Sequence, residues 1–151
     1  MSRCSSLFRV ILSARQNGTS DFPRIPYPKD AAQFEAFAGI GRGLIETHLM
    51  RDAAPGLAET RARFPRQGGN LVEEVRFDAG RVFINAEQYF DNVPRTAWEM
   101  PIGGYQPAQK YLKDRKGREL NGDDIRHYQR IVIALVKTAE AAQKLEALPG
   151  L

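Results

Sequence analysis

The residue types best suited to chemistry are concentrated between Ile102 and Leu120. This segment combines a double glycine, two tyrosines, two glutamines and a dense run of basic residues. Lysine and arginine neutralise phosphates, while glutamine pairs with adenine and arginine with guanine through two hydrogen bonds. Glycine lets a backbone approach a ligand closely. We therefore predict that the segment contacts double-stranded DNA through Tyr105, Gln106, Gln109, Lys110, Lys113, Arg115, Lys116 and Arg118.

The predicted contacts divide into two kinds. We expect the five basic residues from Lys110 to Arg118 to hold phosphates, while Tyr105, Gln106 or Gln109 approaches bases. The sequence has a net charge of +4 and a pI near 9.4, which suit a phosphate-bearing partner but occur in many other proteins. A solvated surface helix remains the competing interpretation of the same basic run.

Other candidate sites have a weaker basis. Gly39-Ile-Gly-Arg-Gly43 lies inside a helical pattern with no strand before it, so close helix packing explains it better than a nucleotide loop. Local spacing places no nucleophile or carboxylate beside His48 or His127, which favours structural roles over a small hydrolase. Asp123-Asp124 suits the first turn of a helix as well as a metal. We expect no catalytic residue, cofactor or metal.

Three helices are expected to position these residues. One is capped by Asp30 and runs to about Met50, a short one occupies about 107–115, and the last runs from a cap at Asn121 or Asp123 to about Leu145. The apolar face of the first would comprise Phe34, Phe37, Ile40 or Gly41, Leu44, Ile45 and His48. That of the last would comprise Ile125, Tyr128, Val132, Leu135, Ala139, Ala142 and Leu145.

A β-hairpin is expected before residues 102–120, which we call the basic segment. Residues 71–77 and 81–85 have strand-like composition, and Asp78-Ala79-Gly80 connects them as a hairpin turn would. Val72, Val75, Phe77, Val82 and Ile84 would supply its buried side, and Tyr89, Phe90 and Trp98 would join the core. The fold class is therefore α+β, a single domain in which a small antiparallel sheet packs against three or more helices, including a long C-terminal one.

The 151 residues suffice for one domain with its own core. We expect residues 1–20 to be an N-terminal tail or linker remnant and 21–151 to form the domain, beginning with an extended stretch at Pro23, Pro26 and Pro28. Cys4 is the only cysteine, which excludes an intramolecular disulfide. No apolar run is long enough to span a bilayer, and we expect a cytoplasmic protein without a membrane partner.

Ordered sequence matches extend over most of the chain from Asp21 onward. They include Asp21-Phe-Pro-Arg-Ile-Pro26, Phe37-Ala-Gly-Ile-Gly41, Leu44, His48-Leu49, Val82-Phe-Ile-Asn85, Gln88-Tyr-Phe90, Val93-Pro94 and Trp98. They are strongest in Ile102-Gly-Gly-Tyr-Gln106, Gln109-Lys110 and Leu112-Lys-Asp-Arg-Lys-Gly-Arg118, and end with His127-Tyr128 and Ile131-Val132. Through these motifs the chain resembles the C-terminal specificity region of type ISP restriction-modification enzymes and related adenine-specific DNA methyltransferases.

In that family one large polypeptide carries a nuclease, a helicase-like motor, an N6-adenine methyltransferase and a terminal recognition module. This chain has neither an Asn-Pro-Pro-Tyr signature nor an S-adenosylmethionine loop. The resemblance therefore implies a non-catalytic, C-terminal target-recognition module whose partners are double-stranded DNA and a methyltransferase or helicase polypeptide. The alternative is an interaction domain that docks on a methyltransferase or helicase subunit without reading DNA.

The resemblance also bears on where base reading would occur. Motif residues shared among proteins that read different sequences suit scaffold or phosphate contacts better than base contacts. We therefore expect the base-reading residues in more variable segments, with residues 51–70 and 78–81 as the candidates.

Overall fold

The computed structural model describes residues 28–50 and 61–148. These residues form four helices and three strands: α2 (Ala31–His48), β1 (Arg76–Asp78), β2 (Arg81–Phe83), β3 (Tyr89–Phe90), α4 (Arg95–Glu99), α5 (Pro107–Lys113) and α6 (Gly122–Glu146). The expected α+β class and long C-terminal helix are confirmed. The predictions for the tail 1–20, for Pro23 and Pro26, and for residues 51–60 concern parts outside the described residues.

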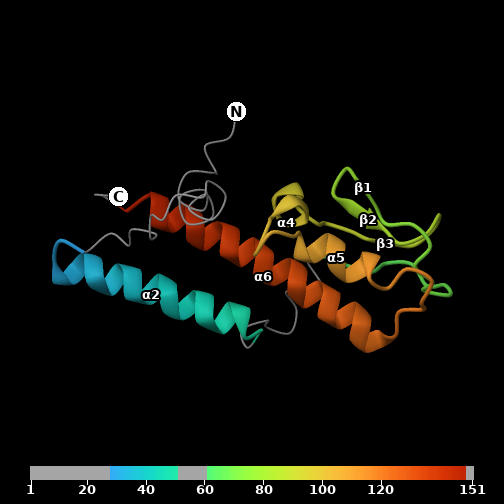
Figure 1. The fold of residues 1–151 in the computed structure, drawn as a ribbon, viewed down its shortest axis with the longest axis horizontal. Coiled ribbons are helices and arrows are strands. Elements are labelled where there is room, and N and C mark those ends of the chain that lie inside the picture. The colour runs from blue at the N-terminus through green and yellow to red at the C-terminus, as the bar shows by residue number, and fades with distance from the viewer. Residues whose placement is uncertain (1–27, 51–60, 149–151) are drawn as a thin grey trace.

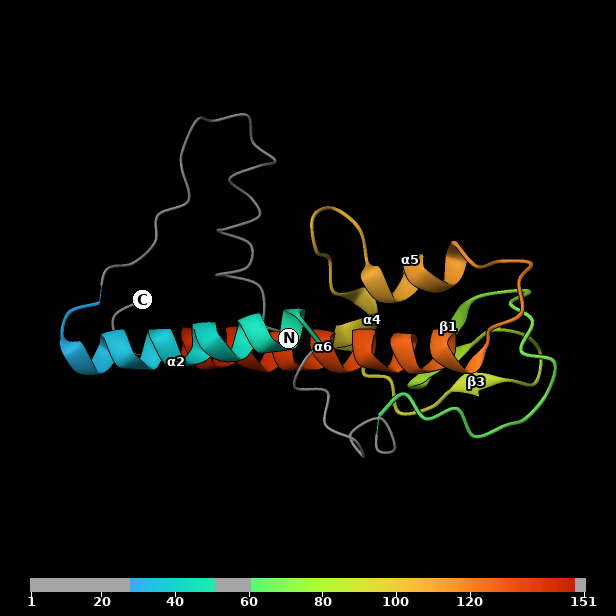
Figure 2. The same cartoon turned by 90° about the horizontal axis from the view of Figure 1, so that it is seen from below.

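Helix α6 organises the molecule. Helix α2 lies antiparallel along its C-terminal half, while the sheet, α4 and α5 gather around its N-terminal half (Figures 1 and 2). Asn121 caps α6 by accepting hydrogen bonds from the backbone N–H groups of Asp123 and Asp124, and the Asp124 carboxylate accepts one from the N–H of Asn121. This reciprocal capping fixes where the helix begins. None of the described helices is long and apolar enough to cross a membrane.

The three strands form an antiparallel sheet in the order β1-β2-β3. Asp78 pairs with Arg81, so the hairpin loop comprises only Ala79 and Gly80, with φ of 45° and 83°. Positive φ at both positions is characteristic of type I′ turns, whose twist matches that of the strands. The expected hairpin is confirmed, but its loop has two residues rather than the expected three, because Asp78 pairs with Arg81 and belongs to β1.

The strands are shorter than their sequence pattern predicts. The N–H groups of Glu73 and Glu74 both donate to the Ile84 carbonyl, so two residues oppose one and the regular ladder is interrupted. Before that point Val72 donates instead to the carbonyl of Arg118. Buried Val72 and half-buried Val75 therefore lie in a segment that pairs with two different parts of the chain.

The core forms where the sheet meets α6. Phe90 of β3 packs on Tyr128 of α6 with ring centroids 4.3 Å apart, and Phe77 stacks on Trp98 at 5.6 Å. Phe90 and Trp98 belong to the core as expected, whereas Tyr89 is half-buried. The expected inner face of α6 is confirmed through buried Tyr128, Val132 and Leu135, with half-buried Ile125, Ala139, Ala142 and Leu145.

The apolar face predicted for α2 is wrong in part. Phe34 and Ile45 are 57% and 58% exposed, whereas Phe37 and Leu44 are half-buried and Thr47 is buried. Positions 37, 40, 44 and 47 follow the narrow seam of a helix that packs against one partner, here α6. Burial of a wider face of α2 would require a second described element packed against this helix.

The glycines of α2 do not provide close helix packing. A Cβ atom built at Gly39, Gly41 or Gly43 would meet no atom of another described element within 4 Å. The packing interpretation of this motif is therefore wrong, and its position inside α2 also does not fit a nucleotide loop, which needs a helix that begins at the glycines.

Candidate nucleic-acid interface

Helix α5 presents the first half of the basic segment. Pro107 occupies the first turn, where its missing N–H costs nothing, and Ala108 and Leu112 are fully buried. Burial of these two positions, four residues apart, turns Lys110 and Lys113 outward. The expected short helix is confirmed, although it ends at Lys113 rather than Arg115.

The double glycine forms a tight turn that leads into α5. Gly103 and Gly104 have φ of 63° and 95°, a region that residues with a Cβ atom rarely adopt. The turn is closed by hydrogen bonding between Ile102 and Tyr105. It leaves Tyr105 49% exposed, and Gln106 follows as an exposed cap residue without a side-chain capping hydrogen bond. Tyr105 and Gln106, two of the three residues predicted to approach bases, are thus accessible.

The side chain of Gln109 forms hydrogen bonds within the domain. Its Nε2 donates to the carbonyl oxygen of Trp98 at 3.2 Å, and its Oε1 accepts from Lys113 Nζ at 3.1 Å. Both ends of the amide therefore have protein partners, and the side chain links α5 to α4.

The turn after α5, residues 114–118, carries the second half of the basic segment and is called the basic turn below. Gly117, with φ of 80°, donates its N–H to the Val72 carbonyl at 2.7 Å, and Val72 donates to the Arg118 carbonyl at 3.0 Å. These backbone bonds fix the turn against the chain that enters the sheet. The side chains of Lys116 and Arg118 remain exposed and form no ion pair with the described residues.

Arg115 differs from the other cations of the segment. Its side chain is only 24% exposed, its Nε lies 3.1 Å from Asp124 Oδ1, and its guanidinium lies 3.6 Å from the centre of the Tyr111 ring. A further hydrogen bond reaches the Tyr111 carbonyl. Arg115 therefore joins the end of α5 to the first turn of α6 and holds the basic turn in place. We refer to Arg115, Asp124 and Tyr111 together as the clamp.

The two acidic groups next to Arg115, the Asp124 carboxyl and the Tyr111 phenol, have shifted pKa values. Partial burial alone would raise the pKa of Asp124, but hydrogen bonds from Arg115, from the Asn121 backbone and from Tyr111 outweigh it and lower the pKa below its usual value. Burial raises the pKa of Tyr111, an effect that the Arg115 charge opposes and the Asp124 carboxylate reinforces. At neutral pH the clamp thus contains a carboxylate, a guanidinium and a protonated phenol.

Lys110 has an exposed ion pair of its own. Its Nζ lies 2.7 Å from Asp114 Oδ2, with both side chains 53% exposed. Such a pair on a helix surface contributes about 0.3–0.5 kcal/mol and is easily exchanged for another anion. Lys110 remains accessible to a phosphate.

Two further cations lie beside the basic turn and were missed in the sequence. Arg126 and Arg130 of α6 line a shallow hollow of about 390 Å³ together with Arg115 and His127. Arg126 pairs with Asp123, while Arg130 is exposed and unpaired among the described residues. Their four-residue spacing on a helix was the available signal, because it places both on one face.

The structure does not bring the two histidines together. His48, exposed at the end of α2, has Nε2 3.2 Å from the hydroxyl of Thr138, whereas the ring of His127 lies 5.2 Å from that of Tyr111. Positions 127 and 138 are separated by about 16 Å along α6. Within 28–50 and 61–148 no three His, Cys, Asp or Glu side chains form a group able to hold a metal.

A match to a known family covers most of the chain. The model of the type ISP C-terminal specificity domain matches residues 16–144. No curated protein and no solved structure matches the chain significantly. The matched range includes both the sheet and the basic segment, so the chain belongs to the family of type ISP C-terminal specificity domains, which serve target recognition in restriction-modification systems.

Proposed function

We propose that the chain is a DNA-binding target-recognition module of an N6-adenine methyltransferase system and is not catalytic by itself. Residues 21–151 form the recognition domain in this proposal, and residues 1–20 are a tail or linker remnant. Double-stranded DNA is the primary partner, and the methyltransferase or helicase polypeptide is the second.

One observation supports DNA binding above the others. Lys113, Lys116 and Arg118 project from one short helix and the turn after it, and none of them forms an ion pair with the described residues. The backbone bonds to Val72 and the Arg115–Asp124 clamp hold that turn in one conformation. Fixed, unpaired cations bind phosphates at a low entropic cost.

The test is a titration of the purified chain with random-sequence duplex DNA at two salt concentrations. The variant replaces Lys113, Lys116 and Arg118 with glutamine. We expect its affinity at low salt to fall by roughly tenfold or more, and the salt dependence to become shallower by about 0.9 per lost phosphate contact. Arg115 is left intact so that the turn keeps its shape.

A matched variant controls for net charge. Lys29, Arg42 and Lys144 are exposed, lie away from the basic segment, and remove the same three charges when changed to glutamine. This control should bind almost as tightly as the unmodified chain. Equal losses in both variants would attribute binding to net charge, and no binding at low salt would reject DNA recognition by the isolated chain.

A second candidate function is docking on a methyltransferase or helicase subunit, and it is favoured by one feature of α2. Phe34, Ile45 and Leu49 are 57%, 58% and 52% exposed, and their spacing places them along one side of the helix. Exposed apolar side chains grouped in this way are typical of interaction surfaces. If this were the whole function, the charge variants would leave subunit binding unchanged and polar residues at these three positions would abolish it.

A further inference from the structure

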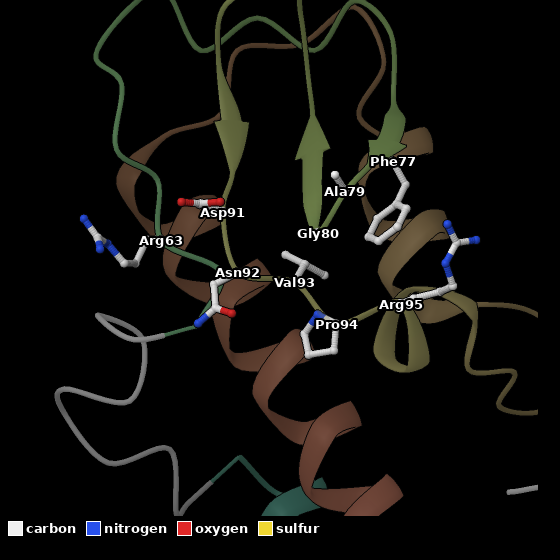
Figure 3. Close-up of a pocket in the computed structure, with 9 residues that line it drawn as sticks. All are labelled: Arg63, Phe77, Ala79, Gly80, Asp91, Asn92, Val93, Pro94 and Arg95. Atoms are coloured by element: carbon white, nitrogen blue, oxygen red, sulfur yellow. The ribbon is translucent and has the colours of Figure 1, made fainter. Parts of the chain in front are cut away.

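An open hollow of about 840 Å³ lies at the tip of the β1–β2 hairpin (Figure 3). The hairpin turn, Ala79–Gly80, forms one edge, and the connection from β3 to α4 forms the floor. Arg63 and Arg95 lie on opposite sides, with Val93 between them (Figure 3). The basic segment contributes no residue to this hollow.

The hollow unites the two segments in which base-reading residues are expected. Arg63 belongs to the described half of 51–70, and Ala79–Gly80 lies at the centre of 78–81. Both are attached to the same stretch of chain, since Asp91 donates its N–H to the Arg63 carbonyl at 2.7 Å and Val93 donates to the Gly80 carbonyl at 2.8 Å. Segments separated in sequence therefore form one surface.

The side chains on the rim have the chemistry of base recognition. Arg63 is exposed and forms no ion pair with the described residues. Arg95 pairs with Glu99 at 2.9 Å, but their side chains are 69% and 55% exposed, so this pair is readily exchanged. Asn92 adds a carboxamide. Arginine reads guanine and asparagine reads adenine in the major groove.

The support beneath these side chains is rigid. Val93 is 1% exposed, and Phe77, which lines the hollow, stacks on Trp98. At the opposite end of β2 and β3 from the hairpin tip, Gln88 is 3% exposed and holds the chain that follows Arg63 by hydrogen bonds to Arg66 and Asn70. A site that discriminates between similar ligands needs such pre-organised support.

The turn at the tip of the hairpin is small compared with the major groove, which is about 12 Å wide. Because β3 lies on the other side of β2 and Val93 bonds to Gly80, the turn and not the two strands would enter the groove. The two-residue turn makes the tip narrow, and exposed Ala79 at that tip has a methyl group of the kind that contacts thymine.

We propose that this hollow and its hairpin tip read base edges in the major groove of duplex DNA, with Arg63 and Arg95 as the principal specificity-determining residues. This inference rests on the proposed DNA-binding function. It assigns sequence discrimination to a surface separate from the basic segment, which supplies affinity for any sequence.

The experiment selects bound duplexes from a random-sequence pool with the full chain and sequences them. Arg63→Ala combined with Arg95→Ala should reduce the preference at one or more base positions by about fivefold to a hundredfold, the range for loss of a bidentate base contact. Affinity for random duplex should change much less. The Lys113, Lys116 and Arg118 variant should show the opposite behaviour, with weaker binding and the same selected motif.

Controls separate the possible failures. Changing Lys29 and Arg42 to alanine removes two charges from the α2 region and should preserve the motif, and melting curves check that each variant is folded. If the chain binds DNA with a motif that the Arg63 and Arg95 variant retains, the inference is overturned while DNA binding stands. If the unmodified chain binds DNA but selects no preferred sequence, the inference is likewise overturned while DNA binding stands. If the chain binds no DNA, the proposed function fails and the inference fails with it.

Discussion

The basic segment and the hairpin hollow are built in opposite ways. The segment is continuous in sequence, since its helix and turn lie within residues 106–118. The hollow is assembled from Arg63, the turn at 79–80 and residues 91–95, which are joined by backbone hydrogen bonds. A run of charge can attract phosphates wherever it is exposed, whereas a surface that distinguishes base edges needs groups held at fixed mutual positions.

The two regions nevertheless share their support. Asn70 accepts and donates hydrogen bonds with Gln88 at the end of the sheet away from the hollow, in the chain that follows Arg63, and it also bonds Leu120 at the end of the basic turn. Tyr128 lies in the core between Phe90 of β3 and Tyr111 of α5. The basic segment and the hollow are separate surfaces that rest on the same buried residues. Substitutions on one surface should therefore leave the other unchanged, whereas substitutions of the buried residues should affect both.

The largest expected effect follows from Gln88→Met. The amide of Gln88 bonds Arg66, Asn70 and Asn85, so its loss leaves several polar groups unpaired in a buried site. We expect the free energy of unfolding to fall by about 2–4 kcal/mol, measured by urea denaturation.

Gln129→Met provides the control for that change. Gln129 is half-buried and donates one hydrogen bond to the Ala62 carbonyl. Its replacement should cost about 1 kcal/mol. Equal costs for the two variants would show that the Gln88 network is not the shared support.

A smaller effect, confined to the basic turn, is expected for Asp124→Asn. The change weakens the helix cap and the bond to Arg115, and should lower the free energy of unfolding by about 1–2 kcal/mol at pH 7. Because the folded protein lowers the pKa of Asp124, this stability is present above about pH 4 and is lost as the pH falls through the folded-state pKa. The difference between the two proteins should therefore narrow below pH 4.

Lys110→Ala is the appropriate comparison for the clamp. It removes an exposed pair in the same segment and should cost no more than about 0.5 kcal/mol. A constant difference between Asp124→Asn and the unmodified chain from pH 7 to pH 3 would contradict the role given to the Asp124 charge.

The smallest effect concerns the core beneath both regions. The hydroxyl of Tyr128 is buried without a hydrogen-bond partner among the described residues, and burial raises its pKa. Tyr128→Phe removes a polar group that lost its water on folding, so stability should rise by about 1 kcal/mol. Loss of stability in thermal unfolding would reveal a hydrogen-bond partner of the hydroxyl and refute this prediction.

The starts of helices and the hairpin turn were predictable because interactions between residues close along the chain decide them. Asp30 and Asn121 begin their helices because their side chains accept from the first-turn N–H groups, and Ala79-Gly80 forms the hairpin turn through its backbone conformation. The short helix that begins at Pro107 was recognisable for the same reason.

Features that depend on distant partners were not predictable in the same way. The exposure of Phe34 and Ile45 depends on how many neighbours α2 has, and the end of the regular ladder at Glu73–Glu74 depends on what the chain meets there. Arg115 looks like its basic neighbours in the sequence, but Asp124 and Tyr111 make it a structural clamp.

The sequence by itself determined the α+β class, the cap at Asp30, the presence of the hairpin and the position of the basic run, because each follows mainly from the pattern of residues close along the chain. Only the tertiary structure decided which cations remain unpaired and that Arg63, the hairpin turn and Arg95 surround one hollow. Those outcomes depend on contacts between residues tens of positions apart, which packing against α6 and the backbone bonds of residues 91–93 bring together.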